Sequence, residues 1–208
     1  MPSLGRLHLI TDTRPGRDPL AVLRAALPVA RAELVVQVRV EDAATDREAY
    51  DLARRVVALC APYGATCLVN DRLHVALAVG ADGGHVGADD LPVGAARRVL
   101  GTGAVLGATA REPVAAAAAV AAGASYLGVG PCHPTSTKTG LPDPIGPAGV
   151  RAVAEAVPVP VIAIGGVTAG SVSALRAAGA YGVAVVGALS GAADPGRATA
   201  VLLGALTC

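Results

Sequence analysis

The chain has 208 residues, which is enough for one domain or at most two small ones. Its formal net charge is +1 at pH 7, and it contains four tyrosines but no phenylalanine or tryptophan. These numbers argue against a nucleic acid or an anionic membrane as partner, because the chain offers neither an excess of positive charge nor many aromatic side chains for base stacking.

Short apolar runs, continuous rather than alternating, recur along the chain and are typical of strands covered on both faces. A segment with helical spacing follows each run. The expected strands are residues 7–11, 34–39, 66–70, 83–86, 105–108, 126–129, 159–164 and 182–186. The expected helices are residues 20–32, a helix capped by Thr45 or Asp46 and ended by Pro62, and then 73–79, 93–100, 113–122, 147–156, 171–178 and 195–206.

This strict alternation of strand and helix predicts parallel strands joined by right-handed crossovers. Eight such units close into a barrel, so we expect residues 1–208 to form a single α/β domain, a (β/α)8 TIM barrel. An open, doubly wound sheet is the alternative, but it requires a glycine-rich turn after the first strand. Here that turn is residues 11–14, which contain no glycine.

Several features indicate a cytoplasmic protein. Residues 1–6 lead directly into the first strand and lack the apolar core of a signal peptide. The most apolar stretch, residues 114–130, is rich in Ala and Gly and is predicted to be helix, turn and strand rather than a membrane span. The cysteines contain no Cys-x-x-Cys pair, so reduced thiols are expected; they are Cys60, Cys67, Cys132 and Cys208.

Three residue types occur only once, and all three lie at or near the end of an apolar run. Lys138 is the only lysine among 17 basic residues, Gln37 is the only glutamine and Asn70 is the only asparagine. Because arginine serves elsewhere as the general positive charge, a single lysine in the hydroxyl-rich loop 128–140 suggests a specific role. The alternative is a solvated surface lysine. In a barrel of this type the active site lies at the carboxyl ends of the strands. The polar residues expected there are Gln37, Arg39, Asn70, Asp71, Asp90, Thr109, Thr135, Thr137 and Lys138.

Glycines follow the last two strands and predict a phosphate site. Gly165 and Gly166 come after the seventh strand, and Gly187 follows the eighth. Glycine lets a phosphate approach backbone N–H groups closely, and a short helix can add its dipole. A tight turn that requires positive φ is the alternative explanation for Gly165 and Gly166.

Asp71 and Asp90 follow neighbouring strands, so their carboxylates could share a hard cation such as Mg²⁺. The alternative is that Asp71, Asp89 and Asp90 cap the helices that come next. Arg39 and Lys138 add more positive charge than a monophosphate needs. We therefore expect a diphosphate here and a second phosphate near the last two strands. Departure of pyrophosphate would leave a cation that the second ligand captures.

Other titratable groups carry weaker signals. His85 is expected to be a packed histidine inside the barrel rather than a residue of the site. Cys132 and His133 suggest a thiol–imidazole pair, but adjacent side chains rarely face each other, so no nucleophile is expected there.

The sequence resembles the thiamine-phosphate synthase family over nearly its whole length. The most specific motif is residues 128–138, Gly-Val-Gly-Pro-Cys-His-Pro-Thr-Ser-Thr-Lys, which is similar to the family's Gly-x-Gly-Pro-x-x-Pro-Thr-x-Thr-Lys. Residues 7–12, 69–71, 81–91, 163–167 and 184–187 also resemble family segments. The resemblance implies a TIM barrel with Mg²⁺ as cofactor. It would couple 4-amino-2-methyl-5-hydroxymethylpyrimidine diphosphate to a thiazole phosphate, giving thiamine phosphate and pyrophosphate.

The resemblance also implies a role for each residue of the site. Asp71 and Asp90 would bind Mg²⁺, and Thr109, which keeps the hydroxyl of the family's usual serine, would bind substrate. The pyrimidine diphosphate would be held by Gln37, Arg39, Asn70 and Lys138, with Arg39 and Lys138 as catalytic cations. The thiazole phosphate and product region would be lined by Thr135, Thr137, Gly166 and Gly187.

Glu41 departs from the family pattern, which has lysine where this chain reads Gln37-Val-Arg39-Val-Glu41. A carboxylate about 6 Å from another unit negative charge opposes it by roughly 3 kcal/mol at an effective dielectric near 20. Glu41 must therefore turn away, pair with a cation or mark an altered function. The alternatives are a thiazole tautomerase-type isomerase, against which the loop around Lys138 argues, and a non-catalytic paralogue that binds thiamine precursors. A homo-oligomer is compatible with the sequence.

Overall fold

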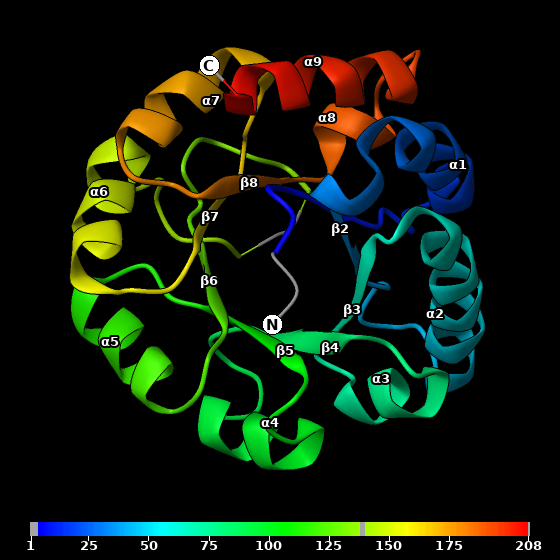
Figure 1. Ribbon diagram of the computed structural model, residues 1–208, viewed down its shortest axis with the longest axis horizontal. Helices are drawn as coiled ribbons and strands as arrows, with labels where there is room; N and C mark the ends of the chain where they lie inside the picture. Colours follow the sequence, from blue (N-terminus) through cyan, green and yellow to red (C-terminus); the bar gives the residue numbers. More distant parts are fainter. Residues whose placement is uncertain (1–3, 138–139, 208) are drawn as a thin grey trace.

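The protein is a closed barrel of eight parallel strands in the computed structural model, which describes residues 4–137 and 140–207 (Figure 1). The strands are β1 Leu7–Ile10, β2 Leu34–Val38, β3 Thr66–Asn70, β4 Gly83–Val86, β5 Val105–Thr109, β6 Tyr126–Val129, β7 Val161–Ile164 and β8 Gly182–Val185. Each strand pairs with the next in the sequence, and β8 returns to pair with β1. The TIM-barrel prediction is confirmed, and the open-sheet alternative is wrong.

Helices form a ring outside the strands (Figure 1). They are α1 Pro19–Ala30, α2 Asp46–Cys60, α3 Leu73–Val79, α4 Val93–Leu100, α5 Pro113–Ala121, α6 Gly146–Ala156, α7 Ala169–Ala177, α8 Gly187–Ser190 and α9 Pro195–Thr207, with 3₁₀ turns η1 Arg31–Glu33 and η2 Ala61–Tyr63. Helix α8 is the element that the sequence analysis missed, because one turn is too short to show a periodic pattern. The first helix was expected to continue to residue 32, but its last part is the separate turn η1.

Local capping explains where the helices begin. The Thr45 hydroxyl accepts from the Glu48 backbone N–H at 3.2 Å, and the Glu48 carboxylate accepts from the Thr45 N–H at 2.7 Å. This reciprocal pair satisfies two N–H groups that a helix start leaves open. Of the two caps expected for α2, the structure therefore has Thr45. Helix α1 begins with a simpler cap, in which the Asp18 carboxylate accepts from the N–H groups of Leu20 and Ala21.

The core has two layers. The larger one lies between the strands and the helices and is built almost entirely from Ala, Val and Leu. The smaller one fills the inside of the barrel and consists of Ile10, Val35, Leu68, Tyr126, Ile162 and Ala184. Polar side chains share this inner layer: His8, Gln37 and His85 are each less than a tenth exposed. A buried polar group needs a hydrogen-bond partner, so hydrogen bonds as well as apolar contacts are expected inside the barrel.

Residues 114–130 form helix α5, a turn and strand β6, as expected. Within the described residues, none of the helices has the length and apolar character needed to cross a membrane. Cys60, Cys67 and Cys132 are free and buried, while Cys208 lies outside the described residues.

Candidate active site at the mouth of the barrel

The parallel barrel brings the carboxyl ends of all strands to one mouth, and most of the predicted site residues lie there. Gln37 is the next-to-last residue of strand β2, and Asn70 and Thr109 are the last residues of β3 and β5. Arg39 follows β2, Asp71 follows β3 and Asp90 follows β4. Thr135 and Thr137 follow β6, Gly166 follows β7, and Gly187, the first residue of α8, follows β8. Lys138 lies outside the described residues.

Asp71 and Asp90 are both tied to the end of strand β4. Asp71 has a left-handed backbone, with φ of 59°, and its N–H donates to the His85 carbonyl at 2.9 Å. Its carboxylate accepts from the Asn70 side-chain amide. The Asp90 carboxylate folds back to accept from the Gly87 N–H at 2.7 Å. Both acidic residues are therefore anchored near the C-terminal end of strand β4.

The helix-cap alternative for these acidic residues is wrong. Helix α3 begins after Arg72 and helix α4 after Pro92, and neither start has a side-chain cap bond. Two anchored carboxylates could instead hold a hard cation. Mg²⁺ suits this donor set, because it takes one or two carboxylates and completes its octahedron with water and phosphate oxygens. The described residues contain no group of three or more His, Cys, Asp or Glu side chains that could bind a softer or more demanding metal.

At the end of strand β2, Glu41 is paired with a cation. Its carboxylate lies 3.8 Å from the Arg39 guanidinium, and the two side chains are 43% and 19% exposed. It also contributes, after Asp12, to raising the pKa of Arg14. Strand β2 ends at Val38, so Glu41 does not continue its inward face. Of the three possibilities open for Glu41, the structure therefore shows pairing with a cation, Arg39.

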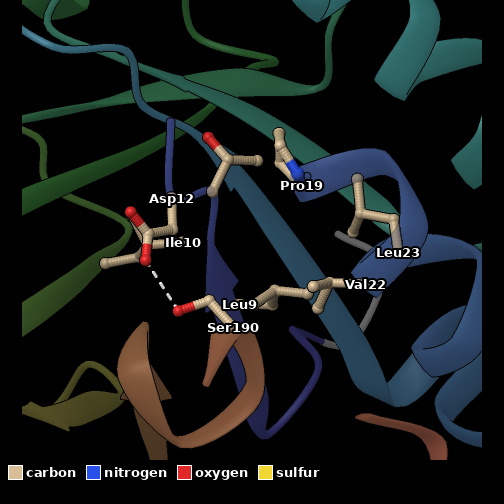
Figure 2. Close-up of a pocket in the computed structure, with 8 residues that line it drawn as sticks. Leu9, Ile10, Asp12, Pro19, Val22, Leu23 and Ser190 are labelled. Carbon is tan, nitrogen blue, oxygen red and sulfur yellow. Dashed lines mark hydrogen bonds between the residues drawn. The ribbon is translucent and has the colours of Figure 1, made fainter. Parts of the chain in front are cut away.

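Asp12 organises the end of strand β1, a role that the sequence analysis missed. Its side chain is only 1% exposed. The Arg14 guanidinium donates to both carboxylate oxygens at 2.8 Å, and the Ser190 hydroxyl donates at 2.7 Å (Figure 2). Hydrogen bonding by Arg14 holds the pKa of Asp12 well below its usual range. The carboxylate therefore ties the loop after β1 to helix α8, which starts at Gly187.

The loop after β6 packs onto the turn after β7. The N–H groups of Cys132 and His133 donate to the carbonyls of Ile164 and Gly165, at 2.8 and 2.9 Å. A Cβ on Gly166 would lie 2.5 Å from the carbonyl oxygen of Pro134, so no larger residue fits there. Gly165 and Gly166 have φ of 90° and 64°. The tight-turn explanation is therefore correct for these two glycines. It does not exclude a phosphate at their N–H groups.

Thr137 connects this loop with the turn after β8. A Cβ on Gly187 would lie 3.6 Å from the Thr137 methyl group. The Thr135 and Thr137 hydroxyl oxygens are 3.1 Å apart and hydrogen-bonded. Hydroxyl donors and two glycine turns from β6, β7 and β8 are thus gathered in one part of the mouth.

His85 and Cys132 behave as expected. His85 is 8% exposed and lies inside the barrel, where its two ring nitrogens contact Tyr126 and Thr109. The Cys132 thiol donates to the Val129 carbonyl, and burial raises its pKa to about 11. A thiol with that pKa is almost entirely protonated at neutral pH, so it is not a nucleophile.

Known proteins resemble this chain over its whole length. A family model described as "Thiamine monophosphate synthase" matches residues 7–189. A thiamine-phosphate synthase of Salinispora arenicola is 80% identical over 208 residues, which is 100% of both chains. One from Salinibacter ruber is 41% identical and covers 95% of this chain and 87% of the relative. A solved thiamine phosphate pyrophosphorylase from Pyrococcus furiosus has a TM-score of 0.86 at 33% identity, over 97% of this chain and 95% of that one.

Proposed function

We propose the roles of individual residues from one established premise: this chain belongs to the thiamine monophosphate synthase family. It is a transferase that joins a phosphorylated pyrimidine to a thiazole phosphate and so forms thiamine phosphate. The isomerase and the non-catalytic paralogue are disfavoured, because full-length relatives at 80% and 77% identity are named as synthases.

One observation carries the proposal for the site: two polar regions lie apart around one mouth. Asp71 and Asp90 follow β3 and β4, while Gly166 and Gly187 follow β7 and β8. In a closed barrel of eight strands in sequential order, β3 and β4 lie across from β7 and β8. A diphosphate in the first region and a monophosphate in the second would make the two substrates face each other.

The diphosphate region is assigned to side chains from β2, β3 and the β6 loop. Arg39 offers a planar fork that can donate two parallel hydrogen bonds to phosphate oxygens, and Lys138 offers a point charge. Asn70 and Gln37 complete the binding of this substrate. Mg²⁺ held by Asp71 and Asp90 would neutralise the charge that develops on the departing pyrophosphate.

The monophosphate region is assigned to backbone and hydroxyl donors. The N–H groups at Gly166 and Gly187 can approach a phosphate closely, because no side chain stands in the way. Thr135 and Thr137 add hydroxyl donors beside them. These donors carry no charge, which suits a substrate that must be held but not activated.

The reaction needs no base between the two regions. The bond that breaks joins the pyrimidine methylene carbon to the diphosphate oxygen, and its electron pair leaves with pyrophosphate. The electron-rich aminopyrimidine stabilises the methylene cation that remains. The thiazole nitrogen then forms the new C–N bond with its own lone pair and has no proton to lose. Arg39 and Lys138 contribute by stabilising charge on the leaving group, and preorganised electrostatic stabilisation of this kind is usually the largest single contribution to catalysis.

The decisive experiment mixes the protein with Mg²⁺, the pyrimidine diphosphate and the thiazole phosphate, and measures thiamine phosphate by chromatography. Product should form with one pyrophosphate released per turnover. Tight binding of both substrates without product would contradict the proposal and support the non-catalytic paralogue.

Replacing Glu41 with glutamine should improve use of the pyrimidine diphosphate. The change frees Arg39 from an opposing charge and removes repulsion of the diphosphate, and exposed ion pairs of this kind are worth about 0.2–1 kcal/mol. We expect the KM for the pyrimidine diphosphate to fall about two- to fivefold, with the KM for the thiazole phosphate unchanged. Steady-state kinetics with each substrate varied in turn would measure both.

Glu155→Gln is the matched control. It removes the same charge from an exposed position at the end of helix α6, which leads into the start of β7 and so lies at the opposite end of the barrel from the mouth. A rise in KM in Glu41→Gln would show instead that the carboxylate holds Arg39 in its productive position.

We also propose that residues 1–208 form one domain of a cytoplasmic enzyme, which its free thiols at Cys60, Cys67 and Cys132 support. The sequence is compatible with a homo-oligomer, and sedimentation equilibrium would give the subunit number.

A further inference from the structure

Tyr126 occupies the middle of the barrel, where its side chain does more than fill space. It is 1% exposed and is the largest fully buried side chain among the described residues. The rings of His8 and His85 flank it, with centroid separations of 5.1 and 5.6 Å. Its hydroxyl oxygen lies 3.0 Å from Nδ1 of His85. A phenol from strand β6 is thus joined to an imidazole from strand β4 inside the core.

A second hydrogen bond continues from the core to the mouth. Nε2 of His85 lies 3.0 Å from the hydroxyl of Thr109 on strand β5. His85 is buried, whereas Thr109 is exposed at the strand end. Through His85, the Tyr126 hydroxyl is therefore connected to Thr109, which the sequence predicts to bind substrate.

The strands make room for this connection with glycines. A Cβ on Gly107 of strand β5 would lie 2.2 Å from the Tyr126 ring and 2.4 Å from Nδ1 of His85. A Cβ on Gly128 of strand β6 would lie 3.1 Å from Cε1 of His85. A glycine inside a strand loses packing and marks a close approach by another group. Here the two glycines mark the space that the Tyr126–His85 pair needs.

The direction of the chain follows from the buried hydroxyl proton. A hydroxyl at this depth needs an acceptor, and His85 Nδ1 is the acceptor in contact with it. The other imidazole beside the ring does not serve, because Nε2 of His8 has no hydrogen-bond partner among the described residues. With Nδ1 accepting, the neutral ring carries its proton on Nε2 and donates it to Thr109. The order of donors is then Tyr126 to His85 and His85 to Thr109.

We propose that Tyr126 is a positioning residue for this reaction: its hydroxyl fixes the direction of the hydrogen bonds through His85, so that Thr109 presents a free hydroxyl proton to the pyrimidine substrate. The inference rests on the proposed function. An aminopyrimidine has ring nitrogens that accept a hydrogen bond, and the Thr109 hydroxyl is a matching donor. The thiazole nitrogen must instead keep its lone pair for the new C–N bond, so this donor suits the pyrimidine.

Tyr126→Phe tests this, because it removes the hydroxyl and keeps the ring. We expect the KM for the pyrimidine diphosphate to rise about five- to tenfold, the size of effect that one hydrogen bond has. The KM for the thiazole phosphate should change less than twofold. Tyr181→Phe is the matched control, because it also loses a partly buried hydrogen bond, which runs from its hydroxyl to the Leu4 carbonyl at 2.7 Å. It should lower the melting temperature without changing either KM.

A double-mutant cycle separates positioning from packing. Thr109→Val should raise the same KM in the wild-type protein and have little further effect in Tyr126→Phe, since both changes remove one interaction. His85→Asn is the second variant, because it keeps a polar group opposite Tyr126 and loses the nitrogen that faces Thr109. It should reproduce the selective rise.

Unchanged KM values in Tyr126→Phe, equal rises for both substrates, or additive effects of Tyr126→Phe and Thr109→Val would each overturn the inference. These outcomes differ from failure of the proposed function, which would appear as a wild-type protein that forms no thiamine phosphate.

Discussion

Replacing Asp90 with asparagine should lower turnover at saturating substrate concentrations about 100-fold or more. The change keeps the shape of the side chain and the acceptor for the Gly87 N–H, but it removes one of two anionic oxygen ligands of the proposed Mg²⁺ site. The departing pyrophosphate then loses much of the charge neutralisation that a bound metal supplies, which is worth several kcal/mol. Asp71→Asn should have an effect of similar size. Steady-state kinetics across a series of Mg²⁺ concentrations would measure both, and higher Mg²⁺ should restore part of the rate.

Metal binding itself provides a second measurement that does not depend on turnover. Titration calorimetry of Mg²⁺ in the presence of pyrophosphate should show weaker binding in both variants. Asp89→Asn is the control, since it removes the adjacent exposed carboxylate and leaves Asp90 intact. Wild-type affinity for Mg²⁺ in Asp90→Asn, or an equal loss in Asp89→Asn, would show that the metal is not held by Asp71 and Asp90.

Lys138→Ala should lower kcat about 10²- to 10³-fold, the range found when one preorganised donor to a developing charge is removed. The prediction rests on sequence, since Lys138 lies outside the described residues. Arg39 is the other cation assigned to the leaving group, and it is partly engaged by Glu41 at 3.8 Å. Most of the burden of stabilising pyrophosphate therefore falls on Lys138 and the metal. Single-turnover measurements would report the chemical step directly, without product release.

Two further variants test whether the effect depends on the positive charge at position 138. Lys138→Arg keeps the charge and should recover part of the rate. Arg111→Ala removes a cation whose guanidinium contacts the Asp143 carbonyl, and it should leave kcat within threefold of the wild type. A change smaller than threefold in Lys138→Ala would make Lys138 an ordinary surface residue and would return the catalytic role to Arg39.

The barrel was predictable because its evidence is local. Runs such as residues 126–129 and 182–186 contain no polar side chain in their interior, and several helices between the runs have caps or glycine ends that can be recognised in the sequence. The boundaries of β3, α3, β4, α4 and β6 agree with the prediction. Helix α8 was missed, and the first helix was drawn too long, because neither a four-residue helix nor a change from α to 3₁₀ geometry alters the apolar pattern.

The meeting of the candidate site residues at one mouth was also predictable, since parallel strands must bring their carboxyl ends together. The contacts between these residues were not. Glu41 was expected to turn away, pair with a cation or mark an altered function, and its carboxylate lies 3.8 Å from the Arg39 guanidinium. A helix cap was the alternative for Asp90, but its carboxylate folds back to the Gly87 N–H. Each outcome depends on a side-chain rotamer, which residue spacing does not encode.

By itself, the sequence determined the class of fold, and it predicted the mouth at which the candidate site lies and the residue types proposed to hold phosphate and metal. Only the tertiary structure decided which of those residues touch. Asp12 and Ser190 are 178 positions apart and hydrogen-bonded, and Tyr126 meets His85 across 41 positions because Gly107 leaves room for them. The reason is physical: hydrophobic periodicity is a property of neighbours along the chain, whereas a buried hydrogen bond requires closure of the barrel to bring distant partners within reach.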